Sequence, residues 1–306
     1  TVASPYFSEN DINFVKSKIS NVLKGRLSTG PYTQDFEKKF AKFIGCKYAV
    51  FLNTCTSALE ISIKSLNLKK NDEVIVPVQS FIADGTCVSN VNAKIIFAEI
   101  DKKNFCINLE EIKRLTSKKT KAIILVYFGG YIPNDLNKIK SYCSKKKIKI
   151  IEDCAHSIGG STKKLNLGCI GYSGCYSFFS TKTITTGEGG MLTTNNKSLH
   201  RFALSMRERG RDWSKKKELY YHEGRNCRVP EISAVLGLNQ LSNLKKFIKH
   251  RNKIVDIYDR GLKDNPHLET LKKNKDYNYS IWKHVTLIKN KKISRLKLQK
   301  YLINNY

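Results

Sequence analysis

The stretch SFFSTKTITTGEGG, residues 177–190, holds a single lysine, Lys182, between an aromatic pair and a glycine-rich turn. Small hydroxyl residues flank this lysine and other charges are few, so its amine could be partly desolvated and lose its proton near neutral pH. A neutral amine is what a lysine nucleophile requires. The alternative is an ordinary solvated lysine, because Lys and Arg together number 55 in this chain.

On both sides of this stretch, short apolar segments alternate with helical ones from residue 45 onward. Strands are expected at 48–52, 73–76, 94–98, 122–126, 148–152, 175–178 and 190–194. Helices are expected at 11–23, 33–43, 57–66, 82–89, 109–115, 134–144 and 198–209. Such alternation is typical of an α/β fold with a largely parallel sheet.

The last quarter of the chain has a different pattern. Two helices are expected, at 230–246 and 249–262, and the second should lead into a smaller C-terminal unit. After Asp264 the Lys- and Asn-rich segment is weakly patterned. We therefore expect a large α/β domain over residues 1–245 and the start of a small domain over 246–306.

Length and composition restrict the class of protein. With 306 residues, 41% of them hydrophobic, the chain can bury a large core. We expect no membrane span and no signal peptide, because there is no run of about 18 apolar residues and no basic segment followed by an apolar one at the start. The nine cysteines are scattered without C-x-x-C pairs. This argues against a metal site or a disulfide framework and fits the reducing cytoplasm.

The formal net charge of +29 raises the question of nucleic acid. The basic residues are spread along the whole length instead of forming one stripe with interleaved aromatic residues, so nucleic acid is not the expected partner. The overall field favours anionic small substrates, such as phosphate or diphosphate compounds.

Residues that follow strands are the first candidates for chemistry, because ligands of parallel sheets gather at the carboxyl ends of the strands. Thr56 and Ser57 open a helix after the first expected strand, where they suit a phosphate or simply cap the helix. Phe81 follows the second strand and either stacks on a planar ring or belongs to the core. Asp153 and His156 follow the fifth strand. A buried carboxylate there needs a partner, either a cationic ring nitrogen or a structural Arg or Lys.

In their order along the chain, these segments resemble the sugar aminotransferases of the DegT/DnrJ/EryC1/StrS family, which are fold-type I pyridoxal phosphate enzymes. The matching motifs are S-G-T-x-A-L at 54–59, G-D-E-V-I-x-P then T-F at 71–81, E-D-A-A-[QH] at 152–156, S-F-x-x-x-K-x-x-x-x-G-E-G-G at 177–190, and N-x-R at 226–228 before A-x-x-G-x-x-Q-L at 234–241. Cys55, Asn71 and Tyr127 depart from the usual Gly, Gly and His.

The resemblance implies a mostly parallel seven-stranded sheet flanked by helices, with a smaller α+β domain at the C-terminal end. Chains of this family run several tens of residues beyond position 306, so we expect the small domain to be incomplete here.

The resemblance also assigns roles to residues. Lys182 would form a Schiff base with pyridoxal 5′-phosphate and then carry the proton. Asp153 would pair with the pyridine nitrogen of the cofactor. His156 would lie near its 3′ oxygen, and Phe81 would stack on its ring.

The remaining roles concern anions. Thr56, Ser57 and Ser177 would bind the cofactor phosphate. Asn226 would reach the phosphate in the neighbouring subunit's site, which requires a homodimer with shared active sites. Arg228, together with Arg207, Arg209 and Arg211, would meet substrate anions.

The implied reaction transfers an amino group, from glutamate, to the keto carbon of a nucleotide-linked 4-keto or 3-keto deoxysugar by ping-pong chemistry on Lys182 in the cytoplasm. One alternative is a pyridoxal-phosphate-dependent sugar dehydratase of the same family, in which histidine takes the place of the lysine. The other is a catalytically silent regulatory or binding protein with the same fold.

Overall fold

A computed structural model describes residues 5–212, 219–290 and 292–305. The seven strands of the main sheet lie within two residues of their expected bounds. They are β1 (Tyr48–Leu52), β2 (Glu73–Pro77), β3 (Lys94–Ala98), β4 (Thr120–Val126), β5 (Lys149–Asp153), β6 (Ser173–Ser177) and β7 (Gly190–Thr194).

The strand order is β1-β7-β6-β5-β4-β2-β3. Strands β3, β2, β4, β5 and β6 run parallel to one another, whereas β7 is antiparallel to both β6 and β1. The expectation of a mostly parallel seven-stranded sheet is therefore confirmed.

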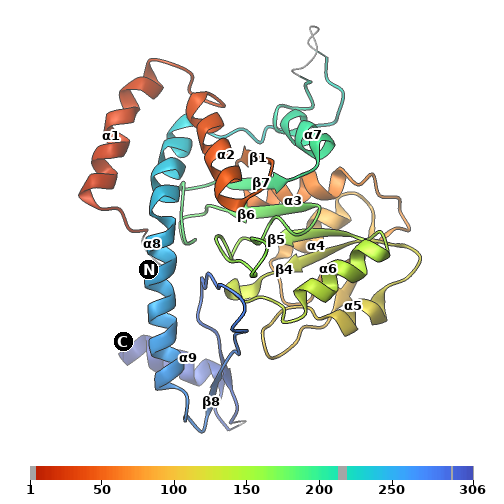
Figure 1. Cartoon of the computed structure of the whole chain (residues 1–306), viewed down its shortest axis with the longest axis vertical. Helices are drawn as coiled ribbons and strands as arrows, with labels where there is room; N and C mark the ends of the chain where they lie inside the picture. Colours follow the sequence, from red (N-terminus) through yellow and green to blue (C-terminus); the bar gives the residue numbers. More distant parts are fainter. Residues whose placement is uncertain (1–4, 213–218, 291, 306) are drawn as a thin grey trace.

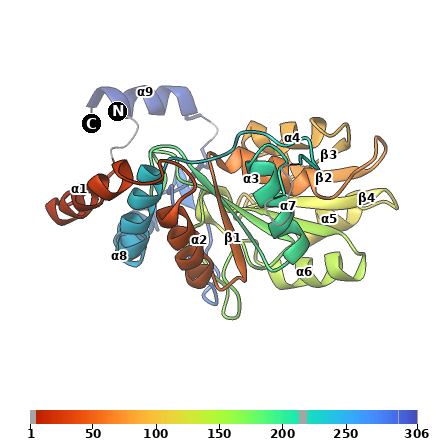
Figure 2. The same cartoon turned by 90° about the horizontal axis from the view of Figure 1, so that it is seen from above.

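Helices cover both faces of this sheet (Figure 1). They are α1 (Glu9–Leu23), α2 (Pro31–Ile44), α3 (Cys55–Lys64), α4 (Ile82–Ser89), α5 (Leu109–Leu115), α6 (Leu136–Lys145) and α7 (Lys197–Arg207), together with a short 3-10 helix, η1 (Phe128–Gly130). Figure 2 shows α4 on one side of the sheet and α6 on the other.

The two layers follow from the alternation of apolar side chains along the strands. On β4, Ile123 and Leu125 pack into a core shared with α2, α5, α6 and α8. Ile124 and Val126 point the other way, into a core shared with α3, α4 and α7. Because both faces are covered, β4 is apolar along nearly its whole length.

The expectation of two helices at 230–246 and 249–262 is wrong. A single helix, α8 (Glu231–Gly261), spans 31 residues and passes alongside the sheet (Figure 1). Neither glycine nor proline interrupts residues 238–260, and Leu241, Leu244 and Val255 continue its buried face. The expected domain boundary at 245/246 falls inside α8, and the division into two domains stays a prediction.

The weakly patterned segment after α8 contains β8 (Leu268–Thr270), β9 (Thr286–Ile288) and α9 (Arg295–Asn305). Strands β8 and β9 form an antiparallel pair. None of the helices in the described part of the chain has the length and apolarity needed to cross a bilayer.

Candidate active site

The carboxyl ends of β1 and β6 meet at one edge of the sheet. Gly190, the first residue of β7, pairs with Leu52 on one side and with Ser177 on the other. Glycine is required there, because an added Cβ would lie 2.2 Å from the carbonyl carbon of Thr54. The loop that carries Lys182 and the start of α3 are therefore packed backbone to backbone.

The lysine loop between β6 and β7 is closed by its own hydrogen bonds. The Phe178 N–H donates to the carbonyl of Gly189 over 2.9 Å, and the Lys182 N–H donates to the carbonyl of Phe179 over 2.9 Å. The Thr185 hydroxyl donates to the Phe178 carbonyl over 3.0 Å. The hydroxyl residues that flank the lysine thus help to hold the loop.

The Lys182 amine is partly desolvated, as its sequence context predicts. Its Nζ lies 4.1 Å from the centroid of the Trp282 ring. Burial lowers the pKa of Lys182, although the Asp153 carboxylate favours the charged amine. The Lys283 ammonium, 4.3 Å from the centroid of the same ring, opposes that charge.

Trp282 organises this part of the site. Its indole N–H donates to the Thr181 carbonyl over 2.7 Å, and its ring stacks on His156 at 4.1 Å between centroids. The Trp282 N–H donates to the Gly129 carbonyl over 2.8 Å, and the Trp282 carbonyl accepts a hydrogen bond from the Arg251 guanidinium over 3.0 Å. Sequence reasoning missed it because the surrounding segment is weakly patterned. The one indication in the sequence was that residue 282 is a tryptophan, a residue type that occurs only twice in the chain.

His156 is neutral. Its Nδ1 accepts the Gly129 N–H over 3.2 Å, so the ring carries its hydrogen on Nε2. Burial lowers the pKa of His156 to about 3, and the nearby Lys182 and Lys283 ammonium groups act in the same direction. The side chain is therefore a hydrogen-bond donor at Nε2.

The two carboxylates of β5 point to opposite faces of the sheet. Glu152 is fully buried and accepts the Tyr127 hydroxyl over 2.7 Å. It also accepts the N–H groups of Gly168, Ile170 and Gly171. Glu152 is thus a structural anchor, and Tyr127, which departs from the family's usual histidine, completes it.

Asp153 faces the other side, toward Lys182. It accepts the Ala155 N–H over 2.8 Å, and the Cys55 Sγ lies 4.0 Å from the same oxygen. Burial raises the pKa of Asp153, while the Ala155 N–H and the Lys182 ammonium favour its charged form. A buried carboxyl in this position suits a cationic partner.

The start of α3 differs in detail from the expectation that Thr56 or Ser57 caps it. The cap is Thr54, whose hydroxyl oxygen accepts the Ser57 N–H over 3.0 Å. The Ser57 hydroxyl donates to the Asn53 side chain over 2.7 Å. The positive end of α3 and its hydroxyl groups face the same edge as Ser177.

Phe81 is not a core residue. Its side chain is 67% exposed at the N-terminus of α4. Val78 and Ile82 beside it are 51% and 71% exposed. This exposure excludes a place in the hydrophobic core for Phe81. Stacking on a planar ring stays a prediction.

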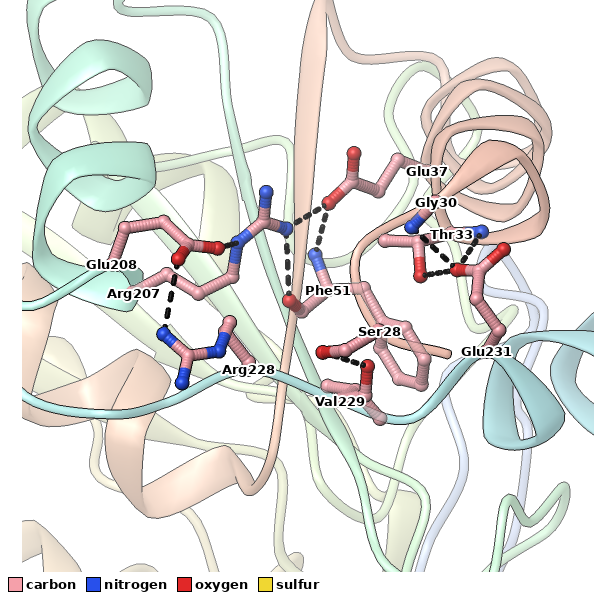
Figure 3. A network of polar contacts seen from close by, with 10 residues as sticks. All are labelled: Ser28, Gly30, Thr33, Glu37, Phe51, Arg207, Glu208, Arg228, Val229 and Glu231. Atoms are coloured by element: carbon pink, nitrogen blue, oxygen red, sulfur yellow. Dashed lines mark hydrogen bonds and ion pairs between the residues drawn. The ribbon is translucent and has the colours of Figure 1, made fainter. Parts of the chain in front are cut away.

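Arg228 lies in a separate polar network (Figure 3), and the backbone of Asn226 joins the same region. The backbone of Asn226, an exposed residue, pairs with that of Glu208. The Arg228 guanidinium donates to the Glu208 carboxylate over 3.1 Å. Among the described residues, no hydrogen bond or ion pair joins Asn226 or Arg228 to Lys182.

The centre of this network is Arg207, which is 8% exposed. Its Nη1 lies 2.6 Å from the Glu37 carboxylate and 3.2 Å from the Phe51 carbonyl (Figure 3). Burial raises the pKa of Glu37, and the charge of Arg207 opposes that rise. Arg207 is therefore a structural residue instead of the expected contact for substrate anions.

A third carboxylate in Figure 3 fixes the start of α2. Glu231, the first residue of α8, is fully buried. It accepts the N–H groups of Gly30, Tyr32 and Thr33 at 2.8, 2.8 and 3.0 Å, and also the Thr33 hydroxyl. A side chain about 200 positions away in sequence thus supplies the N-terminal acceptor that α2 lacks.

A cavity of about 710 Å³ adjoins Lys182. Tyr6, Phe247 and Ile254 give it an apolar wall. The α8 side is basic, with Lys246, Lys249, His250, Arg251 and Lys253. Its size and lining suit a small anionic ligand with an apolar part.

A partly desolvated lysine, a buried carboxyl and a neutral histidine at the carboxyl edge of this sheet are the groups expected of a pyridoxal-phosphate enzyme of fold type I. The sequence model of the DegT/DnrJ/EryC1/StrS aminotransferase family matches residues 10–306. The chain belongs to that family. The expected family, enzyme class and cofactor are thereby confirmed.

Known relatives agree with this assignment. The chain is 34% identical to GDP-perosamine synthase of Escherichia coli O157:H7, over 83% of this chain and 69% of the relative. It superposes on an aminotransferase from Psychrobacter cryohalolentis with a TM-score of 0.90 and 27% identity, covering 99% of this chain and 82% of the other. A GDP-4-keto-6-deoxy-D-mannose-3-dehydratase of E. coli with bound hydrated PLP gives 0.91 and 26%, covering 99% and 82%.

Proposed function

We propose that this aminotransferase moves an amino group from glutamate to the keto carbon of a nucleotide-linked 4-keto or 3-keto deoxysugar. The observation that carries the proposal is Lys182, an amine whose charged form is disfavoured by burial beside the buried carboxyl of Asp153. The similarity to GDP-perosamine synthase supports a nucleotide-linked sugar as the acceptor.

The residues at the sheet edge fit pyridoxal 5′-phosphate. Asp153 offers a buried carboxyl to a protonated ring nitrogen. The N-terminus of α3, with Thr56 and Ser57, and the hydroxyl of Ser177 offer donors to a phosphate. Phe81 offers an exposed aromatic face. When bound, the cofactor supplies an electron sink for the C–H bond that is broken.

The protein's own part is to hold and move protons. Burial lowers the pKa of Lys182, so its amine gives up a proton more readily than that of a solvated lysine, and this suits it to accept a proton from the donor carbon and to pass it on. His156 stays neutral and presents its Nε2–H, which suits a ring oxygen that carries negative charge. Trp282, fixed by its bond to Thr181, limits where the Lys182 amine can lie.

We further propose a homodimer with shared active sites. Val78 and Ile82, on either side of Phe81, are each more than half exposed, and a second copy of the chain would cover them. In this arrangement Asn226 of the partner subunit binds the cofactor phosphate. The exposure of Asn226, and the lack of any hydrogen bond or ion pair from it to Lys182 in the described part of its own chain, support this role.

The charges around the cavity support an anionic substrate. Four Lys and Arg side chains of α8 line it, and Arg228, which lies outside this cavity, is a further candidate for a substrate anion. The nucleotide diphosphate would supply the negative charge. The scattered thiols favour the cytoplasm as the compartment.

The rival function within the family is sugar dehydration, and a dehydratase is among the similar structures. Lys182 favours amino transfer, because a primary amine can form a carbon–nitrogen double bond with the cofactor aldehyde and a histidine ring cannot. A catalytically silent protein with this fold is the remaining alternative.

A test follows from Lys182. The purified protein should bind pyridoxal 5′-phosphate, and borohydride reduction should add the cofactor mass to the peptide that contains Lys182. With ¹⁵N-glutamate and GDP-4-keto-6-deoxy-D-mannose or a dTDP-linked ketosugar, the sugar product should carry the label.

The Lys182→Ala variant should lose the covalent adduct and the transfer, whereas the exposed-lysine control Lys39→Ala should keep both. Loss of a sugar hydroxyl without incorporation of ¹⁵N would support dehydration instead. If the purified protein takes up no pyridoxal 5′-phosphate, both the amino transfer and the dehydration are refuted.

A further inference from the structure

Asp84 is a carboxyl group that the family motifs leave without a role. It lies in the first turn of α4, and its side chain is fully buried. Neither of its carboxyl oxygens makes a well-formed hydrogen bond to the described residues. An ionised carboxylate in such a place is strongly disfavoured, so this side chain needs either a proton or a cation.

The fold places Asp84 against Asp153. Side chains alternate along β5, so Asp153 points to the same face as Ile151. Ile151 packs in one hydrophobic cluster with Ala83 and Cys87, the neighbours of Asp84 on α4. On that face the two carboxyl groups are close enough to act on each other.

The groups around the two carboxyls offer little compensating charge. The polar and titratable groups that act on them are Cys55 of α3, Cys87 of α4, Cys175 of β6, Ser80, Lys182 and the N–H groups of Phe81 and Ala155. Lys182 is the one cation in this set. Burial and the neighbouring Asp153 raise the pKa of Asp84 well above its usual range. Two buried carboxyls with one partial counter-charge hold one proton between them.

We infer that Asp84 is a positioning residue that keeps this proton and donates it in a hydrogen bond to the Asp153 carboxylate. The inference rests on the proposed function, in which Asp153 pairs with the ring nitrogen of the cofactor.

The chemical consequence concerns that ring nitrogen. A carboxylate that accepts a hydrogen bond from a neutral acid has a lower proton affinity. The proton between Asp153 and the ring nitrogen therefore stays on the nitrogen, as the electron sink requires. No net proton transfer occurs, because Asp84 holds its hydrogen throughout. The sequence hid this role, since an acid in the first turn of a helix is ordinarily a solvated partner of the helix dipole.

The first test measures cofactor binding. Asp84→Ala removes the donor and should weaken pyridoxal 5′-phosphate binding by about tenfold or more, as expected for a lost hydrogen bond to a charged group. Asp84→Asn keeps an N–H donor and should stay within about threefold of the wild type. Cys87→Ala, one turn along the same helix, is the matched control and should also stay within about threefold.

The second test needs no cofactor. Because Asp84 binds its proton more tightly in the folded apoprotein than in the unfolded chain, wild-type stability should fall as pH rises above the unfolded value of about 3.9. The Asp84→Asn variant has no titrating group at this position, so it loses this contribution to the pH dependence of stability. Its melting temperature relative to the wild type should therefore increase between pH 5 and pH 8, by about 2 °C or more. Cys87→Ala should parallel the wild type.

The outcomes separate the two proposals. If the wild type binds the cofactor and Asp84→Ala binds it equally well, the role of Asp84 is refuted while the enzyme function stands. Parallel melting curves for the wild type and Asp84→Asn would refute the shared proton. A wild type that fails to bind the cofactor would overturn the proposed function and the role of Asp84 with it, even if the apoprotein curves diverge.

Discussion

His156 stacks on Trp282 with a pKa lowered to about 3, mainly by burial. In the unfolded chain the same ring has a pKa of about 6.5. Between these values the unfolded state binds a proton that the folded state does not, so the contribution of His156 to stability is lost as pH falls below about 6.5.

This predicts that His156 contributes about 1.4 kcal/mol per pH unit below about pH 6 in the apoprotein, a contribution that is measured as the difference between the wild type and a His156 variant because Asp84 acts in the opposite direction in both. His156→Gln should remove most of it, because glutamine does not titrate. Urea unfolding at pH 5 and pH 7.5 measures the difference. His250→Gln, at an exposed site, should retain the wild-type dependence. An equal dependence in His156→Gln would show that other groups cause it.

At the level of single residues, the sequence allowed the chemical groups of the site to be predicted, but not the contacts between them. The types and order of Lys182, Asp153 and His156 predicted an amine, a carboxylate and a donor at one edge, and the structure brings them together. Trp282 and Asp84 could not be predicted. Their importance comes from interactions with residues 101 and 69 positions away, Thr181 and Asp153 respectively.

Among the elements, α2 depends on a side chain from α8. The N-terminus of α2 has glycine as its cap residue and no side-chain acceptor of its own. Glu231 takes that place through bonds to Gly30, Tyr32 and Thr33. We predict that Glu231→Ala lowers the free energy of unfolding by about 3 kcal/mol, because it leaves buried N–H groups without an acceptor.

Glu231→Gln retains one carbonyl oxygen and should cost less, about 1 kcal/mol. Glu9→Ala, which removes an exposed acid at the start of α1, is the control and should cost less than about 0.5 kcal/mol. Urea denaturation compares the three variants. A loss in Glu231→Ala no larger than in Glu9→Ala would contradict the anchoring role.

The strands and most helices could be predicted because each depends on a local periodic pattern. The exact cap of α3 could not, since Thr54, Thr56 and Ser57 are equally good cap residues by type. The continuity of α8 was misjudged because residues 249–253 are all polar and interrupt the apolar spacing that Leu244, Phe247 and Ile248 keep. The packing of α2 against α8 cannot be seen in the local pattern, and it helps to keep the helix continuous.

For the whole molecule, the exposed apolar side chains at the start of α4 predict the oligomeric state. Ile82→Arg places a charge in the proposed dimer interface and should shift the protein from dimer to monomer, because burying an unpaired charge is costly. Light scattering coupled to size-exclusion chromatography measures this. Cofactor binding should weaken in parallel if the partner subunit's Asn226 completes the site.

The control for this variant is Ile303→Arg, a change at a 70% exposed side chain on α9. It should leave the dimer intact. A wild type that is monomeric at micromolar concentration, or an Ile82→Arg variant that remains dimeric, would contradict the shared-site arrangement.

The single long helix α8 has one further consequence. At 1.5 Å per residue its 31 residues form a rod of about 46 Å. The helix begins at Glu231, which binds the N-terminus of α2. Farther along the helix, Arg251 donates a hydrogen bond to the carbonyl of Trp282, and the ring of Trp282 contacts the Lys182 amine. A tilt of this rod at its first turn would therefore displace the tryptophan and, with it, the amine. A substitution of Glu231 should therefore change the position of the Lys182 Nζ, although in the described part of the chain Glu231 makes no contact with the site itself.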